Sequence, residues 1–286
     1  MNTENIAVRL FFGLVSSAII GGLAYRSAAL SRSGVAGAMV VGTSVFGFGG
    51  WVWGATLIAF FVSSSALSRF GANRKRALAD IFAKSSRRDA GQALANGGLA
   101  ALIAVAAGLA GRDAPVFPIL ALAFYGALAA VNADTWATEL GVLARQPPRL
   151  ITTGRLVPTG ASGGVTRQGI LAALAGGAFI GLAAFILTQG VALITTGAWL
   201  LRDWALIPAA AVSGLAGALF DSVLGATVQA VYYCDACGKE TERPIHRCGQ
   251  KTRPLRGWPW LNNDWVNLWA SLAGAVVAAS LASLIF

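Results

Sequence analysis

The chain has 286 residues, of which 56% are hydrophobic and only 12% are charged, and its mean hydropathy is +0.65. Soluble domains usually carry about 25% charged residues, so this composition excludes an ordinary soluble protein and indicates a polytopic membrane protein. The formal net charge of +10 would suit nucleic-acid binding, but the placement of the basic residues argues against that class.

Eight apolar runs recur along the chain, most of them long enough to cross a bilayer, which takes about 20 residues as a helix. They lie at about 6–25, 33–48, 51–68, 92–110, 115–133, 169–188, 204–230 and 264–286. The second run is short, and residues 190–201 could extend the sixth or form a partial helix. The first run lacks the basic start of a signal peptide and is too long for a signal core. We predict an all-α, polytopic transmembrane bundle of about eight spans, forming one integral-membrane domain over residues 1–286.

The basic residues gather on one side of this predicted bundle. The loops 26–32, 69–91, 139–168 and 231–263 hold 19 of the 22 Lys and Arg residues, and the opposite side has only Arg9, Arg112 and Arg202. By the positive-inside rule these four loops face the cytoplasm, and both termini face the other way. The net charge therefore mostly encodes orientation, and we expect no nucleic-acid partner. In a prokaryote the protein would lie in the plasma membrane with its active face toward the cytoplasm.

Acidic residues cluster where the fifth run ends, in a segment that reads Asn132 to Gly141. On a helix, Thr135 and Glu139 share a face, as do Asp134 and Thr138. Such a strip offers the oxygen ligands that Mg²⁺ prefers. Alternatively, these residues only solvate the helix end.

Further polar residues lie near the same membrane border in later runs. Asp221 lies well inside the seventh run, where it could pair with an arginine or serve as a second metal ligand. An ionisable residue within a span is a functional-site hypothesis by default. Asn263 and Asp264 begin the eighth run and could bind substrate or simply cap a helix.

The loop before the sixth run combines glycines with hydroxyl side chains between two arginines. Backbone N–H groups in such a loop, next to the start of a helix, can hold phosphate. Ordinary connecting loops have the same composition, and no P-loop pattern is present. The candidate residues are Arg155, Gly160, Ser162, Gly163, Gly164, Thr166 and Arg167.

All cysteines of the chain and its only histidine fall within fifteen residues, as Cys234, Cys237, His246 and Cys248. Three thiolates and one imidazole make a complete ligand set for tetrahedral zinc. A disulfide would leave one cysteine over and give the histidine no role. We predict a closed, structural zinc site that staples the cytoplasmic loop 231–263.

Five segments of the second half resemble an integral-membrane family that includes transmembrane protein nineteen of animals and the phytyl-phosphate kinase of tocopherol synthesis. They are NADTWATELG (132–141), GASGGVT (160–166), DSVLGATVQ (221–229), the Cys/His cluster and LNND (261–264). One departure is Ala161, where we expect the family often to carry threonine.

This resemblance implies a kinase that transfers a phosphoryl group from CTP or another nucleoside triphosphate to an isoprenyl, phytyl-like monophosphate. In that reading Asp134, Glu139 and Asp221 would hold Mg²⁺ as the catalytic residues. Asn132, Thr135, the Gly160–Thr166 loop with its two arginines, Asn263 and Asp264 would bind substrate. The membrane lipid or isoprenoid and the nucleotide would be the partners of the protein, and the oligomeric state stays open.

Three other functions fit parts of the sequence. A lipid-phosphate cytidylyltransferase needs the same metal and phosphate ligands. A transporter or flippase would also place polar residues in spans, although broken helices at the midplane would be its sign. A scaffold whose zinc loop binds a partner would leave the carboxylates unexplained.

Overall fold

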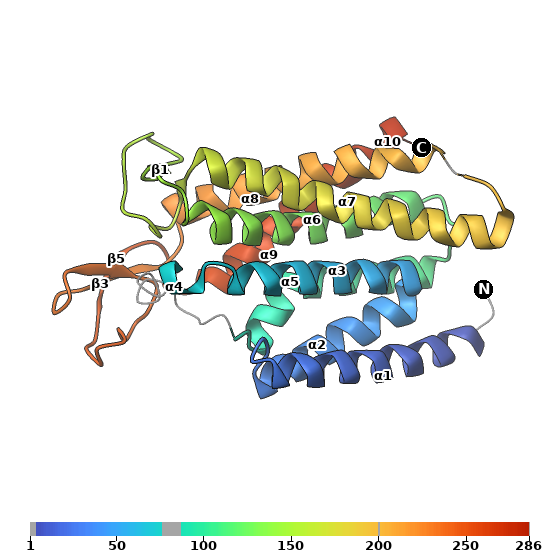
Figure 1. Cartoon of the computed structure of the whole chain (residues 1–286), viewed down its shortest axis with the longest axis horizontal. Helices are drawn as coiled ribbons and strands as arrows, with labels where there is room; N and C mark the ends of the chain where they lie inside the picture. The colour runs from blue at the N-terminus through green and yellow to red at the C-terminus, as the bar shows by residue number, and fades with distance from the viewer. Residues whose placement is uncertain (1–3, 76–86, 200, 286) are drawn as a thin grey trace.

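The computed structural model describes residues 4–75, 87–199 and 201–285, and it is a bundle of long helices with small β-sheets at one end (Figure 1). The all-α transmembrane prediction is confirmed: seven helices are long and apolar enough to cross a membrane. In chain order the elements are α1 (Glu4–Arg26), α2 (Arg32–Ser44), η1 (Val45–Gly49), α3 (Trp51–Arg69), α4 (Ala72–Lys75), α5 (Ala90–Ala110), α6 (Phe117–Gly141), β1 (Arg149–Leu150), β2 (Gly164–Val165), α7 (Arg167–Thr196), η3 (Leu201–Ala205), α8 (Leu206–Thr227), β3 (Val231–Cys234), β4 (Lys239–Thr241), β5 (Arg253–Arg256), α9 (Asn263–Ser280) and α10 (Ala282–Ile285).

The predicted second span is divided between two elements. Helix α2 has only 13 residues, and the π-helical turn η1 continues it for five more. Together they cross the bundle, because the N–H of Ser31 donates to the carbonyl of Arg88 at one end and Gly50 approaches the guanidinium of Arg112 at the other. Among the described residues seven helices are therefore candidate membrane spans, and the predicted second span is formed by α2 and η1 together and not by a single long helix. Residues up to Thr196 extend the sixth predicted span within α7.

Helix α6 is the centre of the bundle. It packs against α7, α8 and α9 on its sides and against α5 and α3, and its residues from Leu122 to Ala133 are buried without interruption. Alanine and glycine predominate in that stretch. Small side chains let helix backbones approach closely in lipid, where van der Waals packing is the main attraction between helices.

Glycines permit the closest of these contacts. A Cβ on Gly126 of α6 would lie 2.5 Å from the carbonyl oxygen of Gly274 in α9, and one on Gly177 of α7 would lie 2.6 Å from that of Ala210 in α8. Both distances are too short for real atoms. The close packing of α6 on α9 and of α7 on α8 therefore requires glycine, which has no side chain, at these two positions.

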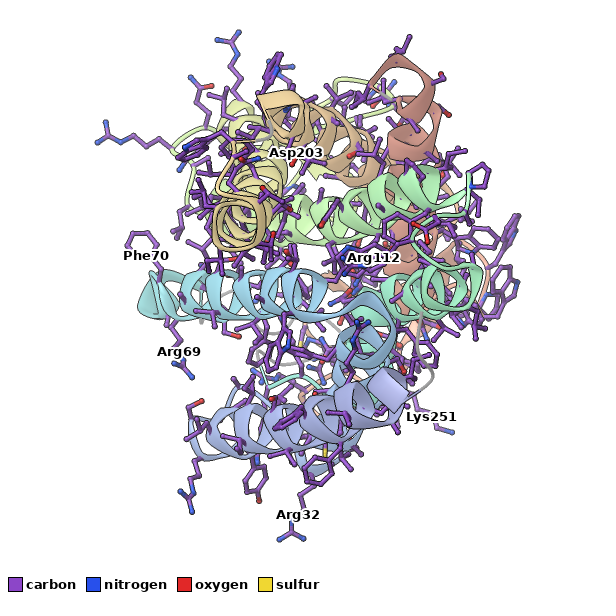
Figure 2. The ribbon with its side chains drawn as sticks, turned by 90° about the vertical axis from the view of Figure 1, so that its right-hand side faces the viewer. Arg32, Arg69, Phe70, Arg112, Asp203 and Lys251 are labelled. Atoms are coloured by element: carbon purple, nitrogen blue, oxygen red, sulfur yellow. The ribbon has the colours of Figure 1, made fainter. Side chains whose placement is uncertain are left out.

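The β-strands, which the sequence did not predict, all lie at one end of the bundle, called here the β-sheet end (Figure 1). Strands β1 and β2 pair antiparallel, and β3 lies between β4 and β5 in an antiparallel sheet of three. Both chain termini lie at the opposite end. Figure 2 looks along the bundle from that opposite end and labels Arg112 and Asp203 there.

We expect Gly126→Ala to lower the stability of the protein by about 1–3 kcal/mol, the usual cost of overpacking a close contact. Gly190→Ala on α7 is a matched control, because a Cβ there meets nothing within 4 Å and alanine favours a helix over glycine by up to about 1 kcal/mol. Thermal unfolding in detergent would measure both variants. Equal unfolding temperatures would contradict the role given to the α6–α9 contact.

Candidate functional site

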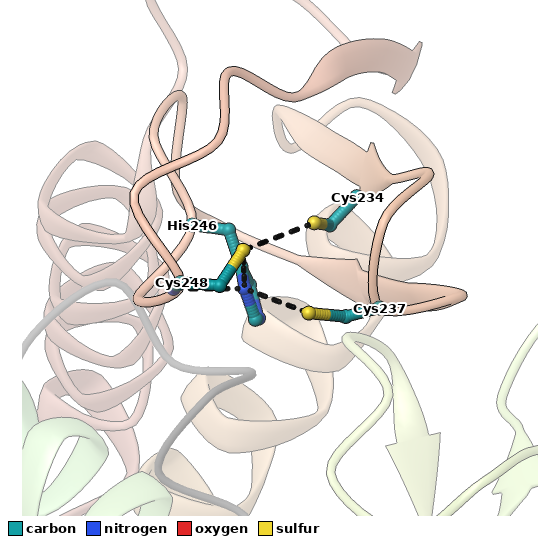
Figure 3. Close-up of side chains that lie close together, drawn as sticks. All are labelled: Cys234, Cys237, His246 and Cys248. Carbon is teal, nitrogen blue, oxygen red and sulfur yellow. Dashed lines mark hydrogen bonds between the residues drawn. The ribbon is translucent and has the colours of Figure 1, made fainter.

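The four predicted metal ligands come together beside the three-stranded sheet. Cys234 ends β3, Cys237 follows in the turn to β4, and His246 and Cys248 lie on a second turn. Their ligand atoms all lie within 4.8 Å of one another. Nδ1 of His246 is 3.2 Å from Sγ of Cys248 and 3.5 Å from Sγ of Cys237, and Figure 3 shows the side chains converging. All three cysteines are free, so the donor set of three sulfurs and one nitrogen fits tetrahedral zinc.

The thiols of this cluster differ in acidity. A hydrogen bond from the backbone of Gln250, followed by one from His246, lowers the pKa of Cys248 to about 6. A hydrogen bond with Cys248 is the main cause that raises the pKa of Cys237 to about 11. Cys248 is therefore a thiolate at neutral pH, which is the form that binds metal. Metal binding would release the proton of Cys237.

Three carboxylates meet below this sheet, inside the β-sheet end of the bundle. Asp134 belongs to α6 and Asp221 to α8, and Glu242 directly follows β4. Their charges interact with one another. Oδ2 of Asp221 is buried and has no hydrogen-bond partner among the described residues. Asp134 and Asp221 are therefore close enough for their charges to interact, and Glu242 is a neighbour that the sequence did not reveal; their role as metal ligands stays a prediction.

Glu242 also ties the glycine-rich loop to the sheet. Its Oε1 accepts hydrogen bonds from Oγ of Ser162, at 3.1 Å, and from Nε2 of Gln229, at 2.8 Å. The guanidinium of Arg256 donates to the carbonyls of Ser162 and Ala226, at 3.1 and 2.8 Å. The loop, the end of α8 and the sheet are therefore held as one unit beside the carboxylates.

The glycines of the 160–166 loop serve this packing. Gly160 and Gly163 have φ angles of +90° and +83°, which suit glycine. A Cβ on Gly163 would lie 2.5 Å from the backbone of Ala226. Gly163 therefore lets the loop lie directly on α8, whereas the sequence suggested that it opens the backbone to a ligand. Gly164 belongs to β2 and pairs with Leu150.

The end of the loop and one of its two flanking arginines, Arg167, line a basic pocket. Thr166 caps α7 by accepting from the N–H of Gly169 at 2.9 Å. Thr166 and Arg167 line a pocket of about 710 Å³ together with Arg145 and Arg149. Arg155 is exposed and is not among the residues that line it.

Glu139 belongs to a different side of α6. It forms an ion pair with Lys75, and it accepts a hydrogen bond of 2.6 Å from Ser68 of α3. Glu139 follows Asp134 by five residues, which is about 140° around a helix. The structure therefore places Glu139 beside Lys75 and Ser68, on another face of α6 from Asp134.

The remaining predicted residues serve mainly as helix contacts or caps. Asn132 is fully buried, accepts from Ser63 and Ser64 at 3.0 and 3.2 Å, and donates to the carbonyl of Gly176 at 2.7 Å. The structure therefore places it between α3, α6 and α7 rather than in the carboxylate site. Thr135 donates to the carbonyl one helical turn before it. Asn263 and Asp264 lie in the first turn of α9, after the N-cap Asn262.

Several known proteins are similar to the chain along most of its length. It is 35% identical to Protein PGR of Arabidopsis thaliana over 91% of each chain. It is 27% identical to an uncharacterized membrane protein of Methanocaldococcus jannaschii, with 97% of this chain and 96% of the relative covered. It is 26% identical to the chloroplastic Protein VTE6 of Arabidopsis thaliana, with 87% of this chain and 64% of the relative covered. No solved structure matches it significantly.

The family described as Integral membrane protein DUF92 matches residues 15–275, which is most of the chain and includes both the Cys/His cluster and the three carboxylates. The chain therefore belongs to this family of integral membrane proteins.

Proposed function

We propose that the protein is a membrane-embedded kinase that transfers a phosphoryl group from a nucleoside triphosphate to an isoprenyl monophosphate. The observation that carries this proposal is the group formed by Asp134, Asp221 and Glu242 at the border of the bundle. Within this group Oδ2 of Asp221 is buried without a hydrogen-bond partner among the described residues, and a buried polar group left unpaired is costly. Mg²⁺ bound there would neutralise charge on the transferred phosphoryl group.

The surroundings of the carboxylates suit a nucleotide. The pocket lined by Arg145, Arg149 and Arg167 offers guanidinium groups, which bind phosphate through paired hydrogen bonds. Phosphoryl transfer needs positioning and charge neutralisation more than covalent chemistry by the protein. CTP is the nucleotide that the family resemblance favours, and ATP is the alternative.

In the proposed reaction an oxygen of the lipid phosphate attacks the γ-phosphorus of the nucleotide. A new P–O bond forms, the bond between the γ-phosphorus and the bridging oxygen breaks, and the nucleoside diphosphate leaves. Asp134, Asp221 and Glu242 would hold the metal and so orient the phosphates. Ser162 donates to Glu242 and accepts from Arg256 through its carbonyl, and these two bonds would help to keep this geometry fixed.

The reaction type is tested by incubating the purified protein with phytyl monophosphate and CTP or ATP that carries either an α- or a γ-phosphorus label. Transfer of the γ label to the lipid is expected. Transfer of the α label with release of pyrophosphate would instead establish a cytidylyltransferase. No transfer from either nucleotide would overturn the enzymatic proposal and leave a transporter or a scaffold as the remaining candidates.

We expect Asp134→Asn to reduce turnover by about 100-fold or more, because it removes a negative ligand at nearly constant volume. Asp113→Asn is a matched control, since Asp113 is exposed in the loop between α5 and α6 at the opposite end. Zinc content and thermal unfolding should be unchanged in both variants. Wild-type turnover in Asp134→Asn would contradict the role of the carboxylates.

We also propose that the Cys/His cluster binds one structural zinc. Elemental analysis should give about one zinc per chain, with three sulfur ligands and one nitrogen ligand by X-ray absorption. Cys234→Ser should lose the metal and also lower turnover, because Glu242 lies on the segment between Cys237 and His246. Asp134→Asn, in contrast, should keep the zinc. Full turnover in a zinc-free protein would show that the cluster does not support the carboxylates.

We further propose that the β-sheet end faces the cytoplasm, on the basis of the 19 basic residues in its loops. Alkaline phosphatase fused after Phe286 should then be active in bacterial cells, because this enzyme folds only outside the cytoplasm. Green fluorescent protein at the same position should stay dark when exported by the same route. The reverse pair of results would place the carboxylates on the outer face.

A further inference from the structure

An apolar cleft separates α3 from the first two helices of the bundle. Helix α3 packs mainly against α6, α7 and η1, whereas α1 packs on α2, and α2 packs on α5. Figure 2 shows α1 and α3 as separate rods with side chains between them. The cleft has a volume of about 80 Å³, is partly open, and its surface is almost entirely apolar. Ile20, Val41, Leu57, Phe61 and Ala93 are among its lining residues.

One end of the cleft is polar. Arg88, Gln92 and Asn96 line it. Gln92 and Asn96 lie one turn apart on α5, and Arg88 comes directly before the N-cap Asp89 of that helix. Gln92 belongs to the capping box of α5 and accepts from the N–H of Asp89 at 3.1 Å. Phe46 of η1 lines the cleft too, and η1 lies toward the opposite end of the bundle. The cleft therefore runs from a cationic end to an apolar interior.

The backbone fixes Arg88 at this position. Its N–H donates to Ala29 at 3.0 Å, and its carbonyl accepts from Ser31 at 2.9 Å. A Cβ on Gly34 would overlap that carbonyl oxygen, so the approach of α2 requires glycine there. Arg88 is thus anchored to the turn between α1 and α2, at the β-sheet end of the bundle.

The guanidinium of Arg88 lacks a hydrogen-bonding partner within the described part of the chain. Its Cζ lies 5.7 Å from the ring centre of Phe60 and 5.9 Å from that of Phe61. Burial lowers the pKa of Arg88, and the charge of Glu139 opposes this effect. Glu139 itself is already bonded to Lys75 and Ser68. The five N–H donors of an arginine are therefore available at the polar end of the cleft.

A cationic, donor-rich end joined to a narrow apolar interior is complementary to one kind of molecule: a single hydrocarbon chain with an anionic head. Guanidinium groups bind phosphate oxygens in pairs, and such charge-assisted hydrogen bonds are strong. We propose that this cleft receives the head-group end of an isoprenyl monophosphate: Arg88 binds the phosphate, the first carbons of the chain enter the cleft, and the rest of the chain lies in the surrounding bilayer. This inference rests on the proposed function and locates the lipid substrate within it.

The position of Arg88 suits that role. Its charge interacts with Glu139 on α6, five residues or about 7.5 Å along the helix axis from Asp134. A head group held by Arg88 would therefore lie at the same level of the bundle as the carboxylates. The end of α6 would thus serve both groups, with Glu139 toward Arg88 and Asp134 toward Asp221.

The test measures binding without nucleotide, so that it is independent of turnover. Purified protein in detergent is titrated with phytyl monophosphate and, separately, with phytol, inorganic phosphate and dioleoyl phosphatidic acid. Saturable binding is expected for phytyl monophosphate, and binding at least about 10-fold weaker for each of the others, because each lacks the head, the chain or the single-chain shape. Wild-type protein that does not bind phytyl monophosphate would overturn the inference.

Two sets of variants locate the binding site, one in the apolar cleft and one at its polar end. Ala93→Phe should fill the cleft and weaken binding of phytyl monophosphate by about 10-fold or more, while Ala106→Phe on the exposed face of the same helix should not. Arg88→Gln should weaken binding by about 10-fold or more, Arg88→Lys should restore part of it, and Arg69→Gln at an exposed position should have no effect. Unchanged binding in both Ala93→Phe and Arg88→Gln would overturn the inference even if the wild-type protein is a kinase.

The two proposals can fail separately. Cleft-dependent binding of phytyl monophosphate without any phosphoryl transfer would keep the lipid site and overturn the kinase. Phosphoryl transfer with a Michaelis constant that neither Ala93→Phe nor Arg88→Gln changes would keep the kinase and overturn the lipid site. Thermal unfolding of each variant identifies any that fails to fold, and Ala38→Phe, from the α2 side of the cleft, then replaces Ala93→Phe.

Discussion

The burial of α6 is the constraint on which the rest of the structure depends. Helix α6 contacts six other helices and has the largest buried share among the candidate spans, so most of its faces must carry residues suited to a neighbour. Between Leu122 and Ala133 half of those residues are alanine or glycine, and glycines on α7, α8 and α9 meet them at backbone distance. Only beyond Ala133, at the β-sheet end, does α6 turn polar. Asp134 then points toward the site shared with α8, and Glu139 toward α3.

This division explains how far sequence reasoning could reach. The spans follow from hydropathy, which is a local property, and the Cys/His cluster follows from a spacing that few other structures require. The grouping of Asp134 with Glu139 looked equally local, but five residues on a helix lead to another face. The sequence suggests Asn132 as a substrate ligand because it is polar among apolar neighbours. The same property lets it join α3 and α7 to α6, and no sequence pattern separates these two roles.

Glu242 could not be found from the sequence because its neighbours give no signal. It lies in a hydrophilic loop where an acid is expected to be solvated, and only the fold turns it inward above α6 and α8. The glycine-rich loop is a related case. Its composition suggested a backbone open to phosphate, whereas Gly163 is closed against Ala226. The arginines that line a real pocket include Arg145 and Arg149, which stand in a stretch without any motif.

The two halves of the chain can now be assigned complementary parts. The second half places carboxylates under a sheet that the Cys/His cluster braces, and Glu242 belongs to both. The first half packs more loosely, because α3 leans on α6 and α7 and leaves a cleft toward α1 and α2. Close packing suits a site where charges must be held in place, since displacement of a buried charge by even a small distance is costly. A looser region suits an apolar chain, because the hydrophobic effect depends on the apolar area removed from water and not on the orientation of the contacting groups. Helix α6 lies between the carboxylates and the cleft. A molecule with a charged head and an apolar tail could therefore reach both environments only near the polar end of α6.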